Sequence, residues 1–186
     1  PSVKRKSGFL TPFYKGSNNL GASVSIPYFF NFSESNDLTF KPRIYADNDF
    51  IVHSEYREAF EYSDLIADFS LNRDEKNTNS HLFAELSGKL DENTKYDLKI
   101  QNVSNSNYLK IHDIKDYTKI IKSDSSLTSY LSIDRVIDED TNLKSSVRLY
   151  ENLSKTDSDK YQYIFPDFNF SKNIDIEEKY NGNFKF

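Results

Sequence analysis

The fold is decided by the stretch Lys95-Tyr96-Asp97-Leu98-Lys99-Ile100-Gln101. Its apolar side chains occupy every second position, and charged or amide side chains occupy the positions between them. Successive side chains of a β-strand point to opposite faces of a sheet, whereas a helix would scatter both sets around its axis. The stretch therefore predicts a strand with one apolar face and one polar face.

The same two-residue period recurs along most of the chain. Clusters of Asn, Asp, Ser, Gly and Lys, which favour turns, separate the alternating runs. These clusters lie at 15–19, 31–37, 46–49, 73–80, 91–93, 138–141, 154–159, 171–173 and 181–183. One longer interruption, 104–126, contains a stretch compatible with a short helical turn at 108–114. Consecutive strands joined by short turns predict an all-β, antiparallel up-and-down meander of about ten strands.

The alternation also predicts which side chains share a face. We expect one common apolar face to contain Leu65, Ala67, Phe69, Leu82, Leu86, Tyr96, Leu98, Ile100, Val147 and Leu149. The opposite face carries the charged side chains. In a membrane β-barrel the apolar face meets lipid, and in a soluble sandwich it meets a second sheet.

Composition narrows the class of protein further. The chain has 186 residues, which fits one domain or part of a larger one, and 15% of them are aromatic, which argues against disorder. With 24 Lys and Arg against 29 Asp and Glu, the net charge of −5 gives no argument for nucleic-acid binding. The absence of Cys excludes disulfides and thiolate metal sites. Because the sequence starts at Pro1 and ends in the alternating run 183–186, we expect a piece excised from a longer protein.

Periodicity alone leaves a soluble β-sandwich and a membrane β-barrel open. No apolar run approaches the roughly 20 residues of a transmembrane helix, but barrel strands need only about 9–11 residues. The predicted strands read longer than the usual five or six residues. If the turns are assigned alternately to the two ends of the sheet, the longer connections 73–80, 104–126 and 154–159 fall at one end. This asymmetry is typical of outer-membrane barrels.

Several motifs, in order along the chain, point to one family. They are Lys4-Arg5-Lys6-Ser7-Gly8-Phe9-Leu10-Thr11-Pro12, Ile26-Pro27-Tyr28-Phe29-Phe30-Asn31, Asn36-Asp37-Leu38-Thr39-Phe40-Lys41-Pro42, Glu55-Tyr56-Arg57, Val103-Ser104-Asn105-Ser106-Asn107-Tyr108-Leu109 and Tyr163-Ile164-Phe165-Pro166-Asp167-Phe168. This series resembles the LptD family of lipopolysaccharide-assembly proteins, also called organic solvent tolerance proteins. One departure is Asn105, which stands where the family usually has Asp.

The resemblance implies that residues 1–186 are the first strands of a very large transmembrane β-barrel in the outer membrane of a Gram-negative bacterium. The implied activity is the insertion of lipopolysaccharide into the outer leaflet through a lateral gate between the first and last strands. The implied partners are lipopolysaccharide, outer-membrane lipid, the plug lipoprotein LptE, and the periplasmic bridge protein LptA, which docks on a domain absent from this chain. The alternative function is that of a soluble or surface-exposed β-rich binding module.

Two sets of site residues follow from this interpretation. Gly8, Phe9, Pro12 and Pro27 are expected at the lateral gate, because proline cannot donate a ladder hydrogen bond and would weaken strand pairing there. Without the resemblance, each proline could equally start a bulge or end a strand. Candidate lumen contacts to lipopolysaccharide share the polar face and are Lys41, Arg43, Lys95, Lys99, Lys144 and Arg148. Alternatively, these cations are solvated charges in the lumen that do not contact substrate.

No enzyme chemistry is expected. His53, His81 and His112 lie in different runs without metal-ligand spacing, so we interpret them as surface or lumen histidines, with no metal and no other cofactor. Asp138-x-Asp140-x-Asn142 begins like a calcium loop but lacks the glycine and the bidentate glutamate, which predicts a hairpin turn. No Ser/His/Asp arrangement or other nucleophile motif is recognisable from the sequence. No catalytic residue is therefore assigned.

Overall fold

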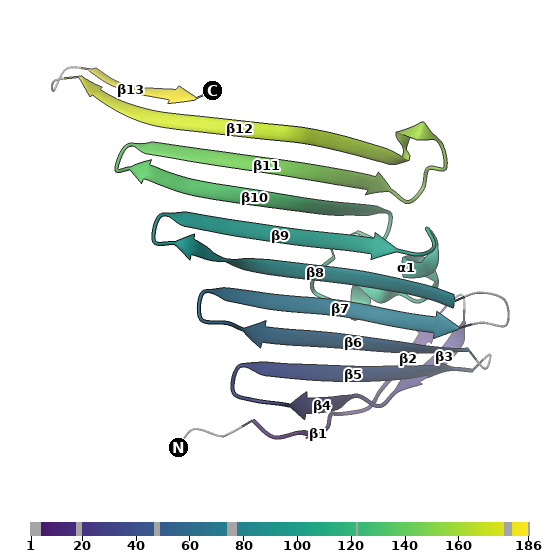
Figure 1. Cartoon of the computed structure of the whole chain (residues 1–186). Helices are drawn as coiled ribbons and strands as arrows, with labels where there is room; N and C mark the ends of the chain where they lie inside the picture. The colour runs from purple at the N-terminus through teal and green to yellow at the C-terminus, as the bar shows by residue number, and fades with distance from the viewer. Residues whose placement is uncertain are drawn as a thin grey trace.

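The computed structural model describes residues 5–17, 20–46, 49–73, 78–121, 123–176 and 180–185. It forms one twisted antiparallel sheet of thirteen strands, which Figure 1 shows edge to edge from β1 to β13. The strands are β1 (Gly8–Phe9), β2 (Phe13–Ser17), β3 (Gly21–Ser25), β4 (Tyr28–Asn31), β5 (Asn36–Tyr45), β6 (Phe50–Ala59), β7 (Ser63–Arg73), β8 (Thr78–Asp91), β9 (Thr94–Val103), β10 (Ser126–Asp138), β11 (Thr141–Asn152), β12 (Tyr161–Ile176) and β13 (Tyr180–Lys185). The predicted all-β meander is confirmed. From β4 to β13 each strand pairs with the next in sequence order, and the sheet is not closed.

The strand register confirms the predicted common apolar face. Leu65 pairs with Leu86, Leu86 with Leu98, Leu98 with Leu131, and Leu131 with Val147. Parallel rows join Ala67 to Ile100 through Ala84, and Phe69 to Leu82. We call this the outer face, and Phe69, Leu82 and Ile100 are 40–47% exposed on it. Such exposure means that nothing within the described part of the chain covers this face.

The observed strand ends differ from two of the predicted turn positions. Residues 171–173 lie inside β12, and residues 181–183 lie inside β13, so the clusters at 171–173 and 181–183 are not turns. Asn, Ser and Lys are compatible with a strand whose other residues are paired on both sides. The predicted turn residues 18–19, 47–48 and 74–77, and Phe186 at the chain end, lie outside the described residues. The connections 104–125 and 153–160 fall at the same end of the sheet, as the predicted asymmetry requires (Figure 1).

Two prolines divide the first hairpin into two short ladders. Gly8 and Phe9 of β1 pair with β4, and residues 13–17 of β2 pair with β3. The intervening residues have no ladder partner on the opposite strand, although Leu10 N–H donates to the carbonyl oxygen of Pro27 at 2.9 Å. Four short strands thus replace two long ones, which is why the sheet has more strands than the meander predicted.

The connection between β9 and β10, residues 104–125, folds back over the charged face of the sheet. We call this the inner face. The connection contains α1 (Tyr108–Ile111) and the 3₁₀ turn η1 (Ile114–Asp116), which confirms the expected helical turn. Its buried apolar side chains, Tyr108, Leu109, Ile114, Ile120 and Ile121, form a core with Tyr45, Ile51 and Phe83 of the sheet. Figure 1 shows α1 behind β8 and, beside it, the hairpin β2–β3. Among the described residues, no helix has the length and apolar character needed to cross a membrane.

Candidate functional site

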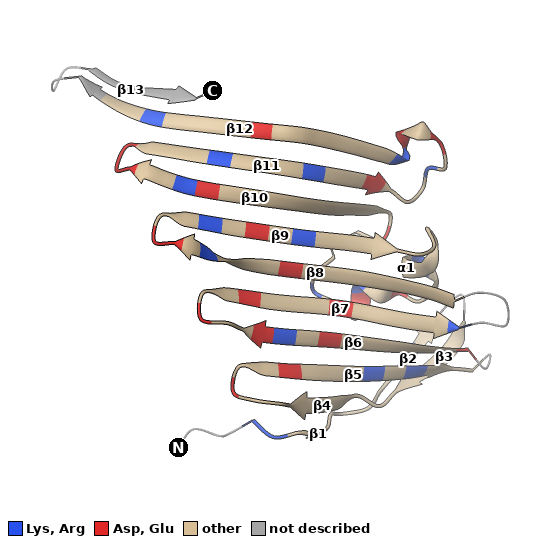
Figure 2. Cartoon of the chain, viewed as in Figure 1, with Lys and Arg blue, Asp and Glu red and all other residues tan. Residues whose placement is uncertain are grey.

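The inner face carries all six cations predicted to contact substrate. Figure 2 shows basic and acidic positions following one another along the strands from β5 to β12. The register places Lys41 and Arg43 opposite His53 and Ile51, and Lys99 opposite Glu85 and Tyr130. Lys95 and Lys144 both pair with Asp134, and Arg148 pairs with Tyr130. The shared face follows from alternation, so it was predictable from the sequence.

Three of these cations hold the connection in place. The ammonium of Lys41 donates to the carbonyl oxygen of Tyr117 at 3.3 Å, and that of Lys99 donates to the carbonyl oxygen of Ile120 at 3.0 Å. The guanidinium of Arg43 stacks on the ring of Tyr117, 3.7 Å from its centroid, and Arg43 is 3% exposed. Lys41 and Lys99 also pair with Glu55 and Glu85. In this structure, all three cations are therefore bound to other groups of the same chain.

The other three cations lie beyond the connection. Lys95 and Lys144 are exposed on either side of Asp134, and Arg148 is half-buried. These three form the part of the predicted cation set that is open on the inner face.

The predicted gate residues lie at the β1 edge of the sheet. Gly8 and Phe9 form the edge strand β1, and Phe9 is 76% exposed with its ring 4.9 Å from that of Tyr28. Pro12 is exposed between β1 and β2, and Pro27 is buried between β3 and β4. The structure thus brings the two prolines to the same break in the hairpin.

The broken hairpin turns toward the connection. The ring of Phe13 lies 5.5 Å from that of Tyr117, and Lys15 forms ion pairs with Asp113 and Asp116. The Lys15 ammonium holds the pKa of the Asp116 carboxyl below its usual value. The first hairpin and the connection therefore form one continuous layer over this part of the inner face.

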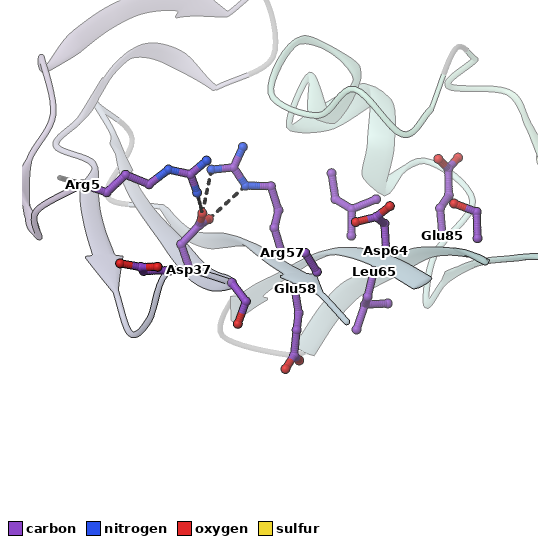
Figure 3. A pocket seen from close by; sticks show the side chains of 12 residues that line it. Arg5, Asp37, Arg57, Glu58, Asp64, Leu65 and Glu85 are labelled. Atoms are coloured by element: carbon purple, nitrogen blue, oxygen red, sulfur yellow. Dashed lines mark hydrogen bonds and ion pairs between the residues drawn. The ribbon is translucent and has the colours of Figure 1, made fainter. Parts of the chain in front are cut away.

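A polar hollow lies beside this layer, at the end of the sheet where short connections join β4 to β5 and β6 to β7. Figure 3 shows the guanidinium groups of Arg5 and Arg57 converging on Asp37, with Asp64 and Glu85 on the same side. Arg57 donates to both carboxylate oxygens of Asp37 at 2.9 and 3.0 Å, and Arg5 donates at 3.1 Å. The hollow measures about 360 Å³. Because carboxylates outnumber guanidiniums in its lining, it is poorly suited to bind a phosphate group.

A buried polar cluster beneath the connection was missed from the sequence. Nε2 of His53 and Nε2 of His81 lie 2.6 and 2.7 Å from the same oxygen of Asp68, Oδ1. Oγ of Ser70 lies 2.5 Å from Nδ1 of His81 and 2.6 Å from the hydroxyl of Tyr108. Each of these five residues is 3% exposed or less. The interpretation of His53 and His81 as surface histidines is therefore wrong, although they do lie on the inner face.

The cluster also brings together a serine, a histidine and an aspartate, an arrangement that was not recognisable from the sequence. Ser70, His81 and Asp68 form a hydrogen-bonded chain, but the serine hydroxyl is engaged by Tyr108 and enclosed by the connection. A nucleophile must reach its substrate, so this arrangement supports no hydrolysis. The available signal was the alternation, which places residues 53, 68, 70 and 81 on one face. Their burial depends on the connection, whose course the period does not specify.

His112 occupies a separate buried position within the connection. Its Nδ1 lies 3.2 Å from the hydroxyl of Tyr45, and its ring packs 4.9 Å from that of Tyr108. Burial lowers the pKa of His112 to about 4. The residue is therefore neutral at pH 7 and packs as part of the core, so for it too the surface interpretation is wrong.

The fold and this two-faced sheet define an all-β strand-meander protein, with one apolar face left open and one charged face partly covered by its own chain. The sequence is similar to LPS-assembly proteins named LptD. The relative from Shewanella denitrificans is 27% identical over 98% of this chain, and that from Pseudoalteromonas translucida is 31% identical over 57%. The relative from Cupriavidus pinatubonensis is 39% identical over 29% of the chain. No protein-family model matches. The chain is thus LptD-like along almost its whole length, and it spans 24%, 15% and 7% of these three relatives.

Proposed function

We propose that this chain is the first part of an outer-membrane β-barrel that assembles lipopolysaccharide in a Gram-negative bacterium. The observation that carries the proposal is the similarity of 98% of the chain to an LPS-assembly protein. The meander adds support, since its outer face leaves apolar side chains exposed in rows that lipid would cover. Outer-membrane lipid is therefore the proposed surroundings of the outer face.

The proposed exit for lipopolysaccharide is a lateral gate at the β1 edge, formed by Gly8, Phe9, Pro12 and Pro27. The two prolines interrupt the β1–β4 and β2–β3 ladders, and every missing hydrogen bond removes roughly 0.5–1.5 kcal/mol of net pairing. An edge that is weakly tied to its neighbour separates at lower cost. This interruption supports the gate assignment.

Lipopolysaccharide carries phosphate groups, and the proposed lumen contacts to them are Lys95, Lys144 and Arg148. Lys41, Arg43 and Lys99 join this set only when the connection moves, because its carbonyl oxygens and the Tyr117 ring now occupy them. The remaining partners are LptE, as a plug in the lumen, and LptA, as a periplasmic bridge that docks on a domain outside this chain. The protein acts as a transporter and not as an enzyme.

Complementation tests the proposal. The complete protein that contains this chain is expressed in a strain whose own LPS-assembly protein is depleted, and surface lipopolysaccharide is measured. Restored delivery and growth are expected, and a variant lacking residues 5–46 should restore neither despite reaching the membrane. If the purified chain is instead monomeric in water without detergent and depleted cells are not rescued, the chain is a soluble binding module.

A further inference from the structure

The buried cluster on β6, β7 and β8 has the composition of a metal site. It presents two imidazole nitrogens and one carboxylate, and these ligand atoms all lie within 4.8 Å of one another. Two imidazoles with one carboxylate suit Zn²⁺ and its first-row neighbours, whereas Mg²⁺ and Ca²⁺ prefer oxygen ligands only. We propose that His53, Asp68 and His81 bind a divalent transition-metal ion, Zn²⁺ or a close relative, beneath the connection.

The hydrogen bonding of the cluster leaves two buried polar atoms without a partner. Asp68 Oδ1 accepts from both imidazoles, whereas Asp68 Oδ2 and His53 Nδ1 have no hydrogen-bond partner among the described residues. An unpaired buried polar atom is costly, and a metal ion would satisfy the second carboxylate oxygen. The uneven use of the two oxygens therefore points to a ligand between these side chains.

The distances require only a small adjustment. Zinc bonds to nitrogen and oxygen are about 2.0–2.2 Å long, which places neighbouring ligand atoms of a tetrahedron about 3.3 Å apart. The present separations from Asp68 Oδ1 are 2.6 and 2.7 Å. Changes in side-chain torsion can open the cluster by this amount. The ion then takes the place of the Nε2 protons, and each neutral imidazole carries its single proton on Nδ1 instead.

An outer layer of side chains orients one ligand. Ser70 Oγ lies 2.5 Å from Nδ1 of His81, so its oxygen can accept the Nδ1 proton that a metal-bound imidazole carries. Tyr108 in turn lies 2.6 Å from Ser70 and belongs to α1 of the connection. A metal held by three strands would therefore also fasten the connection to the inner face. The ion would be structural, because the site is enclosed.

Metal content tests the proposal directly. The complete protein is purified in detergent, stripped with a chelator, and exposed to Zn²⁺ or Co²⁺, with Mg²⁺ and Ca²⁺ as controls. We expect the His81→Ala and Asp68→Asn variants to retain one metal equivalent less than the unmodified protein. His112→Gln is the matched control, because His112 is equally buried on the inner face but lies outside the cluster, and it should retain the full amount.

A second readout needs no variant. Bound Zn²⁺ should slow tryptic cleavage at the exposed Lys110, Lys115 and Lys119 of the connection by at least severalfold, and Mg²⁺ should not. Equal metal content in the unmodified protein and the His81→Ala variant would overturn the proposal. So would cleavage rates that are the same with and without Zn²⁺. Neither readout measures lipopolysaccharide delivery, so the metal site and the proposed function fail independently.

Discussion

Arg57 and Asp37 form a two-bonded ion pair across neighbouring strands. Nε and one terminal nitrogen of Arg57 contact the two carboxylate oxygens of Asp37, whose side chain is 3% exposed. The two residues are also directly paired in the β5–β6 register. They come from two of the motifs that carry the family resemblance, so the structure gives these distant motifs a common physical role.

Removing Arg57 should destabilise the protein more than removing Arg5. The Arg57→Ala substitution leaves a buried carboxylate with one partner and should lower the free energy of unfolding by about 1.5–3 kcal/mol. Arg5 is largely exposed and makes one bond, so Arg5→Ala should cost under about 1 kcal/mol. Denaturant unfolding in detergent measures both. Arg57→Lys is the matched control, which keeps the charge but loses the paired geometry. Equal effects of the two alanine variants would contradict this assignment.

A new arginine on the outer face should destabilise the protein much more than a new arginine on the inner face. Leu98 lies on the outer face, and its neighbour Asp97 lies on the inner face opposite Ser132 and Ser87. If the outer face meets lipid, Leu98→Arg should reduce stability by about 2–4 kcal/mol near the membrane centre. Asp97→Arg should change stability by only about 0.5 kcal/mol. Yield in isolated outer membranes and unfolding from lipid vesicles are the measurements, and a tolerated Leu98→Arg would mean that the outer face is not in lipid.

The faces and the order of strands were predictable because they depend on local sequence. A period of two residues, read along 95–101 or 65–71, specifies which side chains share a face without knowledge of any partner strand. The register then follows from short turns such as Glu92–Asn93. The turns predicted at 171–173 and 181–183 were wrong because Asn and Ser favour turns only on average. Pairing with its neighbouring strands holds 171–173 extended in β12, and pairing with β12 holds 181–183 extended in the edge strand β13.

The inner-face site was less predictable because the connection brings its parts together. Lys41 and Lys99 are 58 residues apart in sequence, yet both contact carbonyl oxygens of one segment, at Tyr117 and Ile120. Nothing in their local pattern distinguishes them from Lys95 or Lys144, which remain exposed. The same segment buries His53 and His81. The course of this long connection, and not the two-residue period, therefore determines which side chains of the inner face are buried.

Acid should loosen the connection through His112. Its pKa falls from 6.5 to about 4 because burial disfavours the imidazolium. Between these pH values, His112 binds a proton when the connection is detached from the sheet but not when it is packed. The packing of the connection therefore becomes less stable as the pH falls from 6.5 to about 4. The loss amounts to about 3 kcal/mol at most. The titratable and charged groups around His112 are Arg43, Tyr45, Asp49, Tyr108 and Asp113.

The measurement is the rate of proteolysis within 104–125 at pH 7.5 and at pH 4.5. The unmodified protein should be cleaved faster at the lower pH, and His112→Gln should show a smaller difference because it cannot take up the proton. Loosening caused by carboxylates alone would instead leave the pH difference of His112→Gln unchanged. The comparison therefore separates the histidine from the neighbouring carboxylates Asp113 and Asp116.

The two prolines of the first hairpin should govern the ease of opening at the β1 edge. Pro12 and Pro27 delete one backbone donor each, at the point where the β1–β4 and β2–β3 ladders are interrupted. If restored donors add 1–2 kcal/mol of pairing, the open population falls about five- to thirtyfold. The double substitution Pro12→Ala with Pro27→Ala should therefore slow lipopolysaccharide delivery without lowering the amount of barrel.

Surface lipopolysaccharide, and outer-membrane permeability to a large antibiotic, measure delivery in cells that carry the double variant. Pro42→Ala is the matched control, because Pro42 lies inside the unbroken strand β5, away from the edge, and keeps its ladder partner Val52. Buried Pro27 also fills space, so barrel abundance and heat resistance must be compared alongside delivery. Normal delivery by an intact double variant would show that the prolines shape the bend of the hairpin toward the connection and have no part in a gate.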